Sequence, residues 1–594
     1  MGGLRRLPIE SRRLQNARLA HMPLPRKSRF RLGHPLLLAL CFCCTPAFAA
    51  DADVRELAQR ATAAYQARDY AASADAFAAA IAAGGNEPAL YYNAACASAL
   101  AGRSEAALDF LQQAMAAGYT GVAAIRADAD LVSLREDPRF ETLLADTERA
   151  EQRRKRMWSS PAFATPYAPV LDEDQRVAGL SRVWSEARFN FAAFDLVPEL
   201  DWDALYLATL PEARAATDTA EYYRVLRRFI AQLRDGHSSI RPPAEVMDQL
   251  DAQPGVRTAL VEGRVFVTGL LDPALAATGL APGMEIVAIE GQPVQAWAEA
   301  NVAPYQPAST PQDLAARTYE RALLSGPVDR PARVTVRDAA GAERELALPR
   351  MGAKAFEAAF WGGPTFELRR LPGNVAYVRI LHFGNSSAVD AFRARFDEIA
   401  TSDGLIIDVR ENGGGNGSEG YKLLSMLADK PFHGSRWQTR EYRPAYRAWG
   451  RPEGVHAEAS EPMPPDAERH YEGQVVVLTS ARTYSAAEDF AVAFDAMQRG
   501  RIVGEPTGGS TGQPLLFDLP GGGTGRIVSK RDSYPDGRAF VGVGVQPQLM
   551  VSPRVADFLA GRDTVLDAAV ALLRKPPVVR TSDSAAATVP PAAE

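Results

Sequence analysis

Four consecutive apolar residues, Val475–Leu478, are followed by a short polar turn and by a run of small and apolar residues that begins at Ser485. This order predicts a buried strand, a tight turn and a helix that opens at Ser485. A serine at such a corner exposes its hydroxyl beside the unpaired N–H groups and the positive end of the helix dipole. These donors suit a developing oxyanion, so Ser485 is a candidate nucleophile. Serine is also a favoured N-cap, so the segment alone leaves a purely structural role open.

A second apolar strand is predicted at Gly404–Asp408, and it runs into a glycine-rich turn that ends at Gly413–Gly415. Glycines allow main-chain N–H groups to approach a ligand, because no Cβ stands in the way. A plain loop at the end of a strand is the alternative interpretation of this segment.

Together the two segments resemble the tail-specific, or C-terminal processing, serine peptidases and their tricorn-type relatives. Thr479–Phe490 is similar to the strand, turn and helix that carry the nucleophile of that family, and Asp408–Gly415 is similar to its Asp-x-Arg-x-Asn-x-Gly-Gly loop. Two later turns, Gly504–Gly509 and Gly542–Pro547, also resemble family landmarks. The likeness extends over about residues 175–575.

The resemblance implies a ClpP/crotonase-like α/β catalytic domain in which Ser485 is the nucleophile. It also implies an oxyanion hole formed by the N–H group of Gly414, or of its neighbour Gly413, and by that of Ala486. No catalytic metal or cofactor is expected, because the sequence has no His-Glu-x-x-His zinc helix and no phosphate-binding loop of the Walker type.

A serine hydroxyl needs a base beside it. The processing peptidases of the family use a lysine 25 residues after the serine, but that position is Ser510 here, and the next lysine, Lys530, is expected at the surface. Tricorn-type members use a histidine, and Asp235–His237 matches their Asp-Gly-His pattern. We therefore predict His237 as the general base, since an imidazole titrates near neutral pH.

Two alternatives to this assignment stay open. His237 could simply occupy a turn after the helix predicted over Ala220–Leu233, because Asp-Gly is a turn sequence. His382, in a predicted strand, is the second candidate for the base.

The residue that orients His237 is less clear from the sequence. Tricorn-type enzymes have a serine just before the histidine, where this chain has Gly236, and a late glutamate, for which the region around Val541 offers no counterpart. Glu505 is our preferred candidate, and Ser510 and Asp235 are the others. Glu488, one turn into the helix after Ser485, is expected to be structural.

The first residues predict export. Residues 1–34 are rich in Arg and Lys, Pro35–Cys44 is apolar, and Ala47–Ala49 has the small-x-small form of a cleavage site. An apolar stretch of ten residues is too short for a membrane span, which needs roughly 20, so it indicates a secretory signal peptide. We expect a periplasmic or secreted protein that is not an integral membrane protein, with translation starting at Met1 or Met22.

The net charge indicates which partners to expect, and the cysteine count indicates whether a disulfide can form. Residues 1–50 hold nine Lys and Arg and one acidic residue, which leaves 57 basic and 71 acidic side chains and a net charge of −14 for the mature chain. Such an acidic chain is not expected to bind nucleic acid. Cleavage near Ala49 leaves Cys96 as the one cysteine, so no intrachain disulfide is expected.

An alanine-rich region precedes the part with the candidate site, and it repeats. Two similar segments end at Gly84 and at Gly118, 34 residues apart, which is the period of tetratricopeptide repeats. These repeats could bind a protein partner or could simply cap the fold.

A segment Gly279–Val294 resembles the Gly-Leu-x-x-Gly-Asp-x-Ile hairpin of PDZ domains, which bind extended C-terminal peptides by strand addition. A long polar loop over Trp437–Glu472 could act as a lid. The expected organisation is, in chain order, a signal peptide (1–49), tetratricopeptide-like helical repeats (52–148), a linker (149–173), the N-terminal helical part of the peptidase (174–241), a PDZ-like β domain (250–350), the catalytic domain (355–575) and a disordered tail (576–594).

The sequence therefore predicts a multidomain α and α/β protein that hydrolyses peptide bonds of polypeptides by a Ser-His acyl-enzyme mechanism. Recognition of the substrate's C-terminus is one expected mode of binding. The alternative is a non-catalytic peptide- or ligand-binding scaffold that retains the peptidase fold, because no lysine and no clear orienting acid are present.

Overall fold

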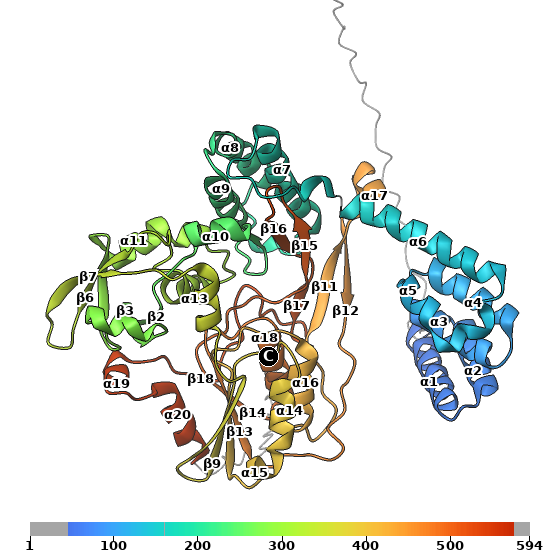
Figure 1. Cartoon of the computed structure of the whole chain (residues 1–594). Helices are drawn as coiled ribbons and strands as arrows, with labels where there is room; N and C mark the ends of the chain where they lie inside the picture. Colours follow the sequence, from blue (N-terminus) through green and yellow to red (C-terminus); the bar gives the residue numbers. More distant parts are fainter. Residues whose placement is uncertain (1–45, 160, 575–594) are drawn as a thin grey trace, which may run out of the picture. The chain divides into compact units, whose positions relative to one another are not determined.

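The structure is a computed structural model that describes residues 46–159 and 161–574 (Figure 1). The chain forms two compact units, Met1–Arg153 and Arg154–Glu594. The predicted signal peptide, up to residue 45, and the predicted tail lie outside the described residues. None of the described helices is both long and apolar enough to cross a membrane.

The first unit is helical. Its helices are α1 (Pro46–Gln66), α2 (Tyr70–Ala82), α3 (Pro88–Leu100), α4 (Ser104–Ala116), α5 (Val122–Ala127) and α6 (Pro138–Trp158), the last of which runs into the second unit. Leu108, Leu111 and Ala114 are buried on one face of α4, at the spacing of an amphipathic helix. The assignment of these helices to tetratricopeptide repeats stays a prediction.

The second unit is built around a mostly parallel sheet with the strand order β18-β14-β13-β10-β9-β8. The strands are β8 (Phe366–Leu371), β9 (Val375–Ile380), β10 (Gly404–Asp408), β13 (Gln474–Thr479), β14 (Gly500–Gly504) and β18 (Leu549–Met550). Every pair is parallel except β8 with β9. The mixed α/β class predicted from the sequence is thereby confirmed.

Side chains of these strands alternate between two buried faces, as the pleat requires. Leu405, Ile407 and Val477 lie in the core with helices α14 (Ser387–Ala394), α16 (Gly417–Ser425) and α18 (Ala486–Met497). Ile406 and Val476 point the other way, against helix α20 (Thr564–Leu573). Figure 1 shows α14 and α16 on one side of the strands and α20 on the other. Burial on both faces explains why the strands are continuous apolar runs.

A helical segment packs beside this sheet and carries the candidate base. Helices α7 (Glu173–Asn190), α8 (Trp202–Ala215) and α9 (Thr219–Ala231) share a core with strands β15 (Pro514–Asp518) and β16 (Thr524–Val528). The short strand β1 (Ser239–Arg241) then pairs antiparallel with β16. This pairing fixes the position of the turn that contains His237, nearly 300 residues before β16 in the chain.

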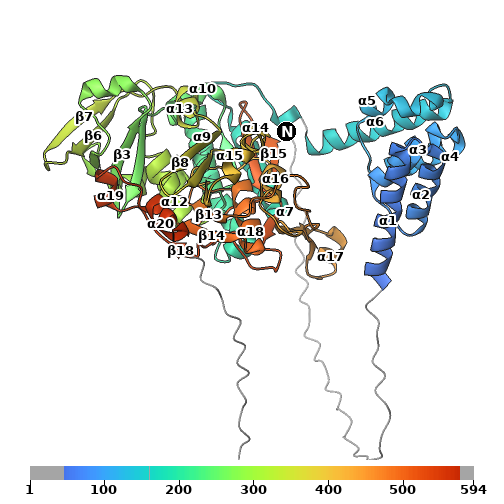
Figure 2. The same cartoon turned by 90° about the horizontal axis from the view of Figure 1, so that it is seen from below.

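The region predicted to be PDZ-like is an antiparallel sheet with the order β2-β3-β4-β6-β7. Its strands are β2 (Val256–Val261), β3 (Arg264–Leu270), β4 (Glu285–Ile289), β6 (Ala332–Arg337) and β7 (Glu343–Leu348), of which Figure 2 labels β3, β6 and β7. Helix α11 (Val294–Asn301) packs on this sheet through Val294 and Ala298. Its identity as a PDZ domain stays a prediction.

The long loop expected at Trp437–Glu472 is in part ordered secondary structure. Strands β11 (Arg436–Glu441) and β12 (Gly454–Glu458) form a hairpin around helix α17 (Pro444–Ala448), and β11 also pairs with β17 (Arg531–Ser533). The prediction of a loop over the whole of Trp437–Glu472 was wrong, because β12, the helix and all but the first residue of β11 lie within it. Most of these side chains are polar and at least partly exposed, so the hydrophobic alternation that indicates a strand is missing.

Candidate active site

Ser485 lies at the corner between β13 and α18, as the N-cap of the helix. Its backbone has φ 55° and ψ −126°, a region that a residue with a Cβ rarely adopts. Such a conformation costs on the order of 1–3 kcal/mol and persists because the surrounding structure holds it. The adjacent loop requires glycine, since a Cβ at Gly414 would lie 2.7 Å from the Cβ of Ser485.

His237 contacts the nucleophile candidate directly. Its Nε2 lies 3.0 Å from Oγ of Ser485, and the imidazole is buried, with 6% of its surface exposed. The ring is stacked on that of Tyr484, with 5.3 Å between the centroids and 12° between the planes. A hydroxyl that donates to Nε2 at this distance can pass its proton to the imidazole without any movement of the chain.

The other imidazole nitrogen contacts Ser510. Nδ1 of His237 lies 2.8 Å from Oγ of Ser510, whose hydroxyl in turn lies 3.4 Å from Oδ1 of buried Asp235. If Nδ1 carries the proton, each group donates once along the series Ser485, His237, Ser510, Asp235. The second carboxyl oxygen of Asp235 accepts a hydrogen bond of 2.6 Å from Ser238. The series leaves Nε2 free to accept from the nucleophile.

The electrostatics of the site keep the imidazole neutral. Burial first, and then the positive charges of Arg526, Arg317 and Lys530, together lower the pKa of His237 to about 3. Burial also raises the pKa of Asp235 above its ordinary range. A neutral imidazole is the form that can accept a proton.

Glu488 shapes the loop that holds Ser510. Its carboxyl oxygens accept hydrogen bonds from the N–H groups of Gly509 at 2.7 Å and Ser510 at 2.9 Å, from the Thr507 hydroxyl at 2.6 Å and from the Ser485 N–H at 3.2 Å. Burial raises the pKa of Glu488 to about 8, although all four donors favour the charged form. Glu488 thus ties the loop to the start of α18, which agrees with the structural role expected for it.

Tyr484 is a site residue that the sequence did not indicate. Its hydroxyl donates to Asp313 at 3.2 Å, and the guanidinium of Arg317 lies 5.1 Å from the centre of its ring. A Cβ at Gly236 would lie 1.7 Å from the Tyr484 hydroxyl. The serine that the resemblance to tricorn-type enzymes led us to expect at position 236 would therefore overlap Tyr484. The hydrogen bond from Tyr484 to Asp313 joins residues 171 positions apart, so no local sequence pattern could predict it.

The predicted oxyanion donors differ in their availability. The N–H groups of Ala486 and Gly413 have no acceptor within the part of the chain that the structure describes. The Gly414 N–H already donates to Oδ1 of buried Asn412 at 2.9 Å. Gly413 thus has an N–H group that is unpaired among the described residues, whereas Gly414, which lies against Ser485, would first have to leave Asn412.

The remaining predicted residues lie elsewhere. Among the described residues, no hydrogen bond joins Glu505 to His237; burial raises the pKa of Glu505, whose carboxyl faces Ser552, Glu320 and Arg482. His382 contacts Thr365 and the Gly384 N–H instead of Ser485. Lys530 pairs with Asp532 at 2.7 Å. The preference for Glu505 as the orienting residue therefore has no contact to support it, whereas Ser510 has one.

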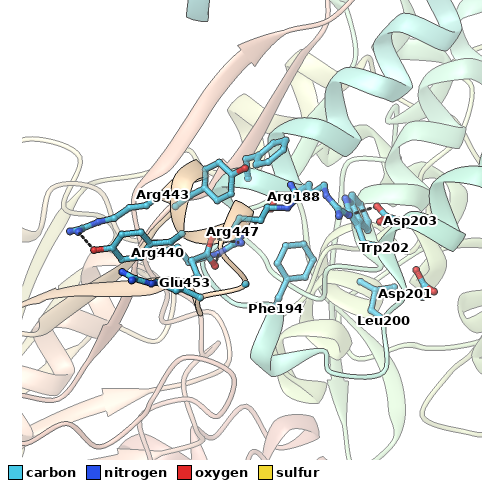
Figure 3. Close-up of a pocket in the computed structure, with 15 residues that line it drawn as sticks. Arg188, Phe194, Leu200, Asp201, Trp202, Asp203, Arg440, Arg443, Arg447 and Glu453 are labelled. Atoms are coloured by element: carbon cyan, nitrogen blue, oxygen red, sulfur yellow. Dashed lines mark hydrogen bonds and ion pairs between the residues drawn. The ribbon is translucent and has the colours of Figure 1, made fainter. Parts of the chain in front are cut away.

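A separate cavity of about 720 Å³ lies between the helical segment and the β11–β12 hairpin (Figure 3). The guanidinium of Arg440 lies 5.7 Å from the centre of the Phe194 ring of the helical segment, whereas Arg443 is directed toward Tyr446 of its own hairpin. Arg440 pairs there with Glu453 at 2.8 Å. This cavity shares no lining residue with the Ser485–His237 site.

Part of the chain is similar to known peptidases. Residues 374–551 match the model of peptidase family S41. The chloroplastic C-terminal processing peptidase of Tetradesmus obliquus is 29% identical over 183 residues, which are 30% of this chain and 36% of that protein. The chain is therefore matched over about a third of the length of this relative.

Solved structures show the same fold over a longer stretch. Mature CPAF in complex with lactacystin has a TM-score of 0.52 and 16% identity, and the match covers 68% of this chain and 98% of that chain. Mature CPAF by itself has a TM-score of 0.50 and 17% identity, over 65% of this chain and 94% of that chain. These structures show a shared fold, and the match to the family S41 model over residues 374–551 covers both sides of the Ser485 corner.

Proposed function

We propose that this protein is a serine peptidase that hydrolyses peptide bonds of polypeptide substrates through an acyl-enzyme formed on Ser485. The observation that carries the proposal is the 3.0 Å contact between Oγ of Ser485 and Nε2 of a buried, neutral His237 at a strained corner. The match of residues 374–551 to a peptidase family supports it.

In the first step Oγ of Ser485 attacks the peptide carbonyl while Nε2 of His237 takes the hydroxyl proton. The carbonyl oxygen becomes an oxyanion, which the N–H groups of Ala486 and Gly413 stabilise, with Gly414 as the alternative donor. His237 then donates its proton to the leaving amine, and the C–N bond breaks. Water, deprotonated by His237, attacks the ester, and Ser485 regains its proton as the acid product leaves.

Ser510 and Asp235 hold the imidazole ready for this cycle. Ser510 accepts from Nδ1–H and so fixes the tautomer in which Nε2 is the acceptor. When His237 becomes positively charged, the Ser510 dipole and the Asp235 carboxyl lie on the side where that charge develops. We expect this arrangement to stabilise the positively charged imidazole less than a carboxylate bonded directly to Nδ1 would.

The proposal also assigns functions to the signal peptide, the PDZ-like region and the helical repeats. The signal peptide directs the chain to the periplasm or outside the cell, the PDZ-like region binds polypeptide substrates, with recognition of a C-terminus as one mode, and the helical repeats bind a protein partner. The strongly acidic mature chain supports a polypeptide, and not nucleic acid, as the substrate.

The test uses the mature wild-type chain, Ser485→Ala and His237→Ala, with an unfolded protein and short peptides as substrates. Both variants are expected to lower kcat/KM by at least about 10³-fold, as loss of a nucleophile or base does. Ser387→Ala and His433→Ala are matched controls, because both residues are exposed and outside the site. A wild type that cleaves none of the substrates would favour the non-catalytic scaffold.

A further inference from the structure

A cavity of about 510 Å³ lies between the PDZ-like region, helix α9 and strand β16. It adjoins the candidate active site, because Arg526 and Arg317 contribute both to its wall and to the surroundings of His237. Five arginines line it, namely Arg227, Arg241, Arg317, Arg321 and Arg526. The carboxylates in its lining are Asp251 and Glu357.

Three of the five arginines have a carboxylate partner. Arg227 binds Asp251 through two bonds of 2.7 Å, Arg241 lies 3.5 Å from Glu357, and Arg317 lies 2.6 Å from Asp313. These pairs stabilise the walls of the cavity and leave little of their charge for a ligand.

The other two arginines have no carboxylate partner in the described ranges. Arg526 donates to neutral acceptors, the Ser239 hydroxyl at 2.8 Å and the Gly236 carbonyl at 3.3 Å. The Arg321 guanidinium lies 5.1 Å from the centre of the Trp361 ring, and none of its N–H groups has an acceptor among the described residues. Arg321 is exposed to the cavity, so its donors remain available to a ligand.

The charges in this cluster repel each other. The protein atoms that surround its solvent-accessible side chain, and then the charge of Arg317, lower the pKa of Arg321 to about 10. The same two causes lower the pKa of Arg526. A bound anion would relieve this repulsion, which a neutral group cannot do.

The shape and lining of the cavity suit a carboxylate on a peptide. A guanidinium offers a planar pair of donors that matches a carboxylate. Phe356, Trp361 and Leu516 provide apolar surface beside the arginines, and Leu516 is 73% exposed. Because Arg526 contacts the residue just before His237, a peptide held here would lie next to the nucleophile.

We propose that Arg321 and Arg526, with Arg317 beside them, form a subsite that binds a carboxylate of the polypeptide substrate next to the bond that is cleaved. A polypeptide supplies this group either as an Asp or Glu side chain or as its free C-terminus. This inference rests on the proposed peptidase function, and it names the class of substrate that the site prefers.

The test compares quenched fluorescent peptides that differ in one group only. One pair has Glu or Gln at each position near the scissile bond in turn, and the other has a free or an amidated C-terminus. Wild type is expected to favour one carboxylate form by roughly 10- to 100-fold in kcat/KM, as a charge-assisted hydrogen bond allows. The pair that shows the preference identifies the source of the carboxylate.

Arg321→Gln is expected to abolish this preference and to leave kcat/KM for the neutral peptide within about twofold, because Arg321 touches none of the reacting groups. Arg321→Lys should restore part of it. Arg447→Gln removes the same charge from the cavity of Figure 3 and should leave the preference unchanged. A wild type without any preference, or an equal loss on both peptides in Arg321→Gln, would overturn the proposal.

The subsite and the peptidase function can fail separately. Binding of the same peptides to Ser485→Ala, followed by fluorescence anisotropy, reports on the subsite without any hydrolysis. If wild type cleaves nothing but Ser485→Ala binds the carboxylate form at least about tenfold more tightly, the subsite stands and the peptidase function fails. If all peptides bind equally well and wild type cleaves them, the subsite proposal fails and the peptidase function stands.

Discussion

At the scale of single residues, the chemistry depends on how Ser510 presents His237. The Ser510 side chain contacts Nδ1 of His237 and connects it to Asp235. Ser510 therefore acts through His237, as a positioning residue.

Ser510→Ala should lower kcat by roughly 10- to 100-fold and change KM little, because the imidazole loses the partner that fixes its tautomer, a loss of about 1–3 kcal/mol. Ser510→Thr keeps a hydroxyl and should retain more of the activity. Steady-state kinetics on a quenched peptide decide the point. Equal kcat for wild type and Ser510→Ala would show that the contact has no part in catalysis.

The low pKa of His237 predicts an unusual pH profile. The group stays neutral down to about pH 3, so kcat/KM should remain level between pH 5 and 8. An unperturbed histidine would instead lose activity below about pH 6.5. Because the unfolded chain binds this proton at a higher pH than the folded chain, stability falls as the pH decreases from about 6.5 toward 3.

The acid limit of activity should therefore coincide with unfolding, which circular dichroism at each pH can follow. A folded enzyme whose kcat/KM falls with a midpoint near the ordinary histidine pKa would contradict the buried, neutral imidazole.

At the scale of elements, two turns meet at the site and leave little space. The Asp235–His237 turn packs on Tyr484, and the Gly413–Gly415 loop packs on the Ser485 corner. Both close contacts depend on glycine.

Gly236→Ser should abolish most of the activity, since its Cβ would overlap the Tyr484 hydroxyl and force the ring away from His237. Tyr484→Phe removes that hydroxyl, so the double variant should recover part of the loss. The kcat/KM values of wild type, the two single variants and the double variant form a double-mutant cycle. If the two substitutions lower kcat/KM independently, the packing explanation is excluded.

Glu488→Gln should destabilise the chain and displace the Ser510 loop, because an amide nitrogen cannot accept the hydrogen bonds that one carboxyl oxygen accepts. We expect a loss of about 1–3 kcal/mol in the free energy of unfolding, measured in urea, and a lower kcat. Glu505→Gln is the matched control, since Glu505 does not contact His237. A larger loss of kcat in Glu505→Gln than in Glu488→Gln would instead favour Glu505 as the residue that orients His237.

The sequence predicted the strands and turns that carry the site residues, but not the long-range contacts between their side chains. The apolar run before Ser485 and the glycine-rich turn after Asp408 are local patterns that a buried parallel strand imposes, so they can be found without a structure. The contacts of Ser510 with His237 and of Tyr484 with Asp313 join residues 273 and 171 positions apart. The pairing of β1 with β16 helps to bring the His237 turn to the Ser510 loop, and spacing in the sequence does not encode this pairing.

At the scale of the whole molecule, all residues of the candidate site belong to the second unit, Arg154–Glu594. A chain that begins at Arg154 should therefore fold and hydrolyse short peptides with a kcat/KM within about threefold of the full chain, because a compact unit with its own core can fold alone. A comparison of protein-substrate turnover by the full chain and by the shortened chain then shows whether the helical unit contributes to the cleavage of proteins. Loss of short-peptide hydrolysis would show that the first unit is needed for the site itself.

The most direct measurement of the central claim is labelling of the folded wild-type chain with a fluorophosphonate, followed by mass spectrometry of its peptides. The account predicts one covalent adduct on Ser485, with labelling strongly slowed in His237→Ala, because the reagent reacts only with a serine that a neighbouring base activates. A folded wild type that stays unlabelled at Ser485 would contradict the account.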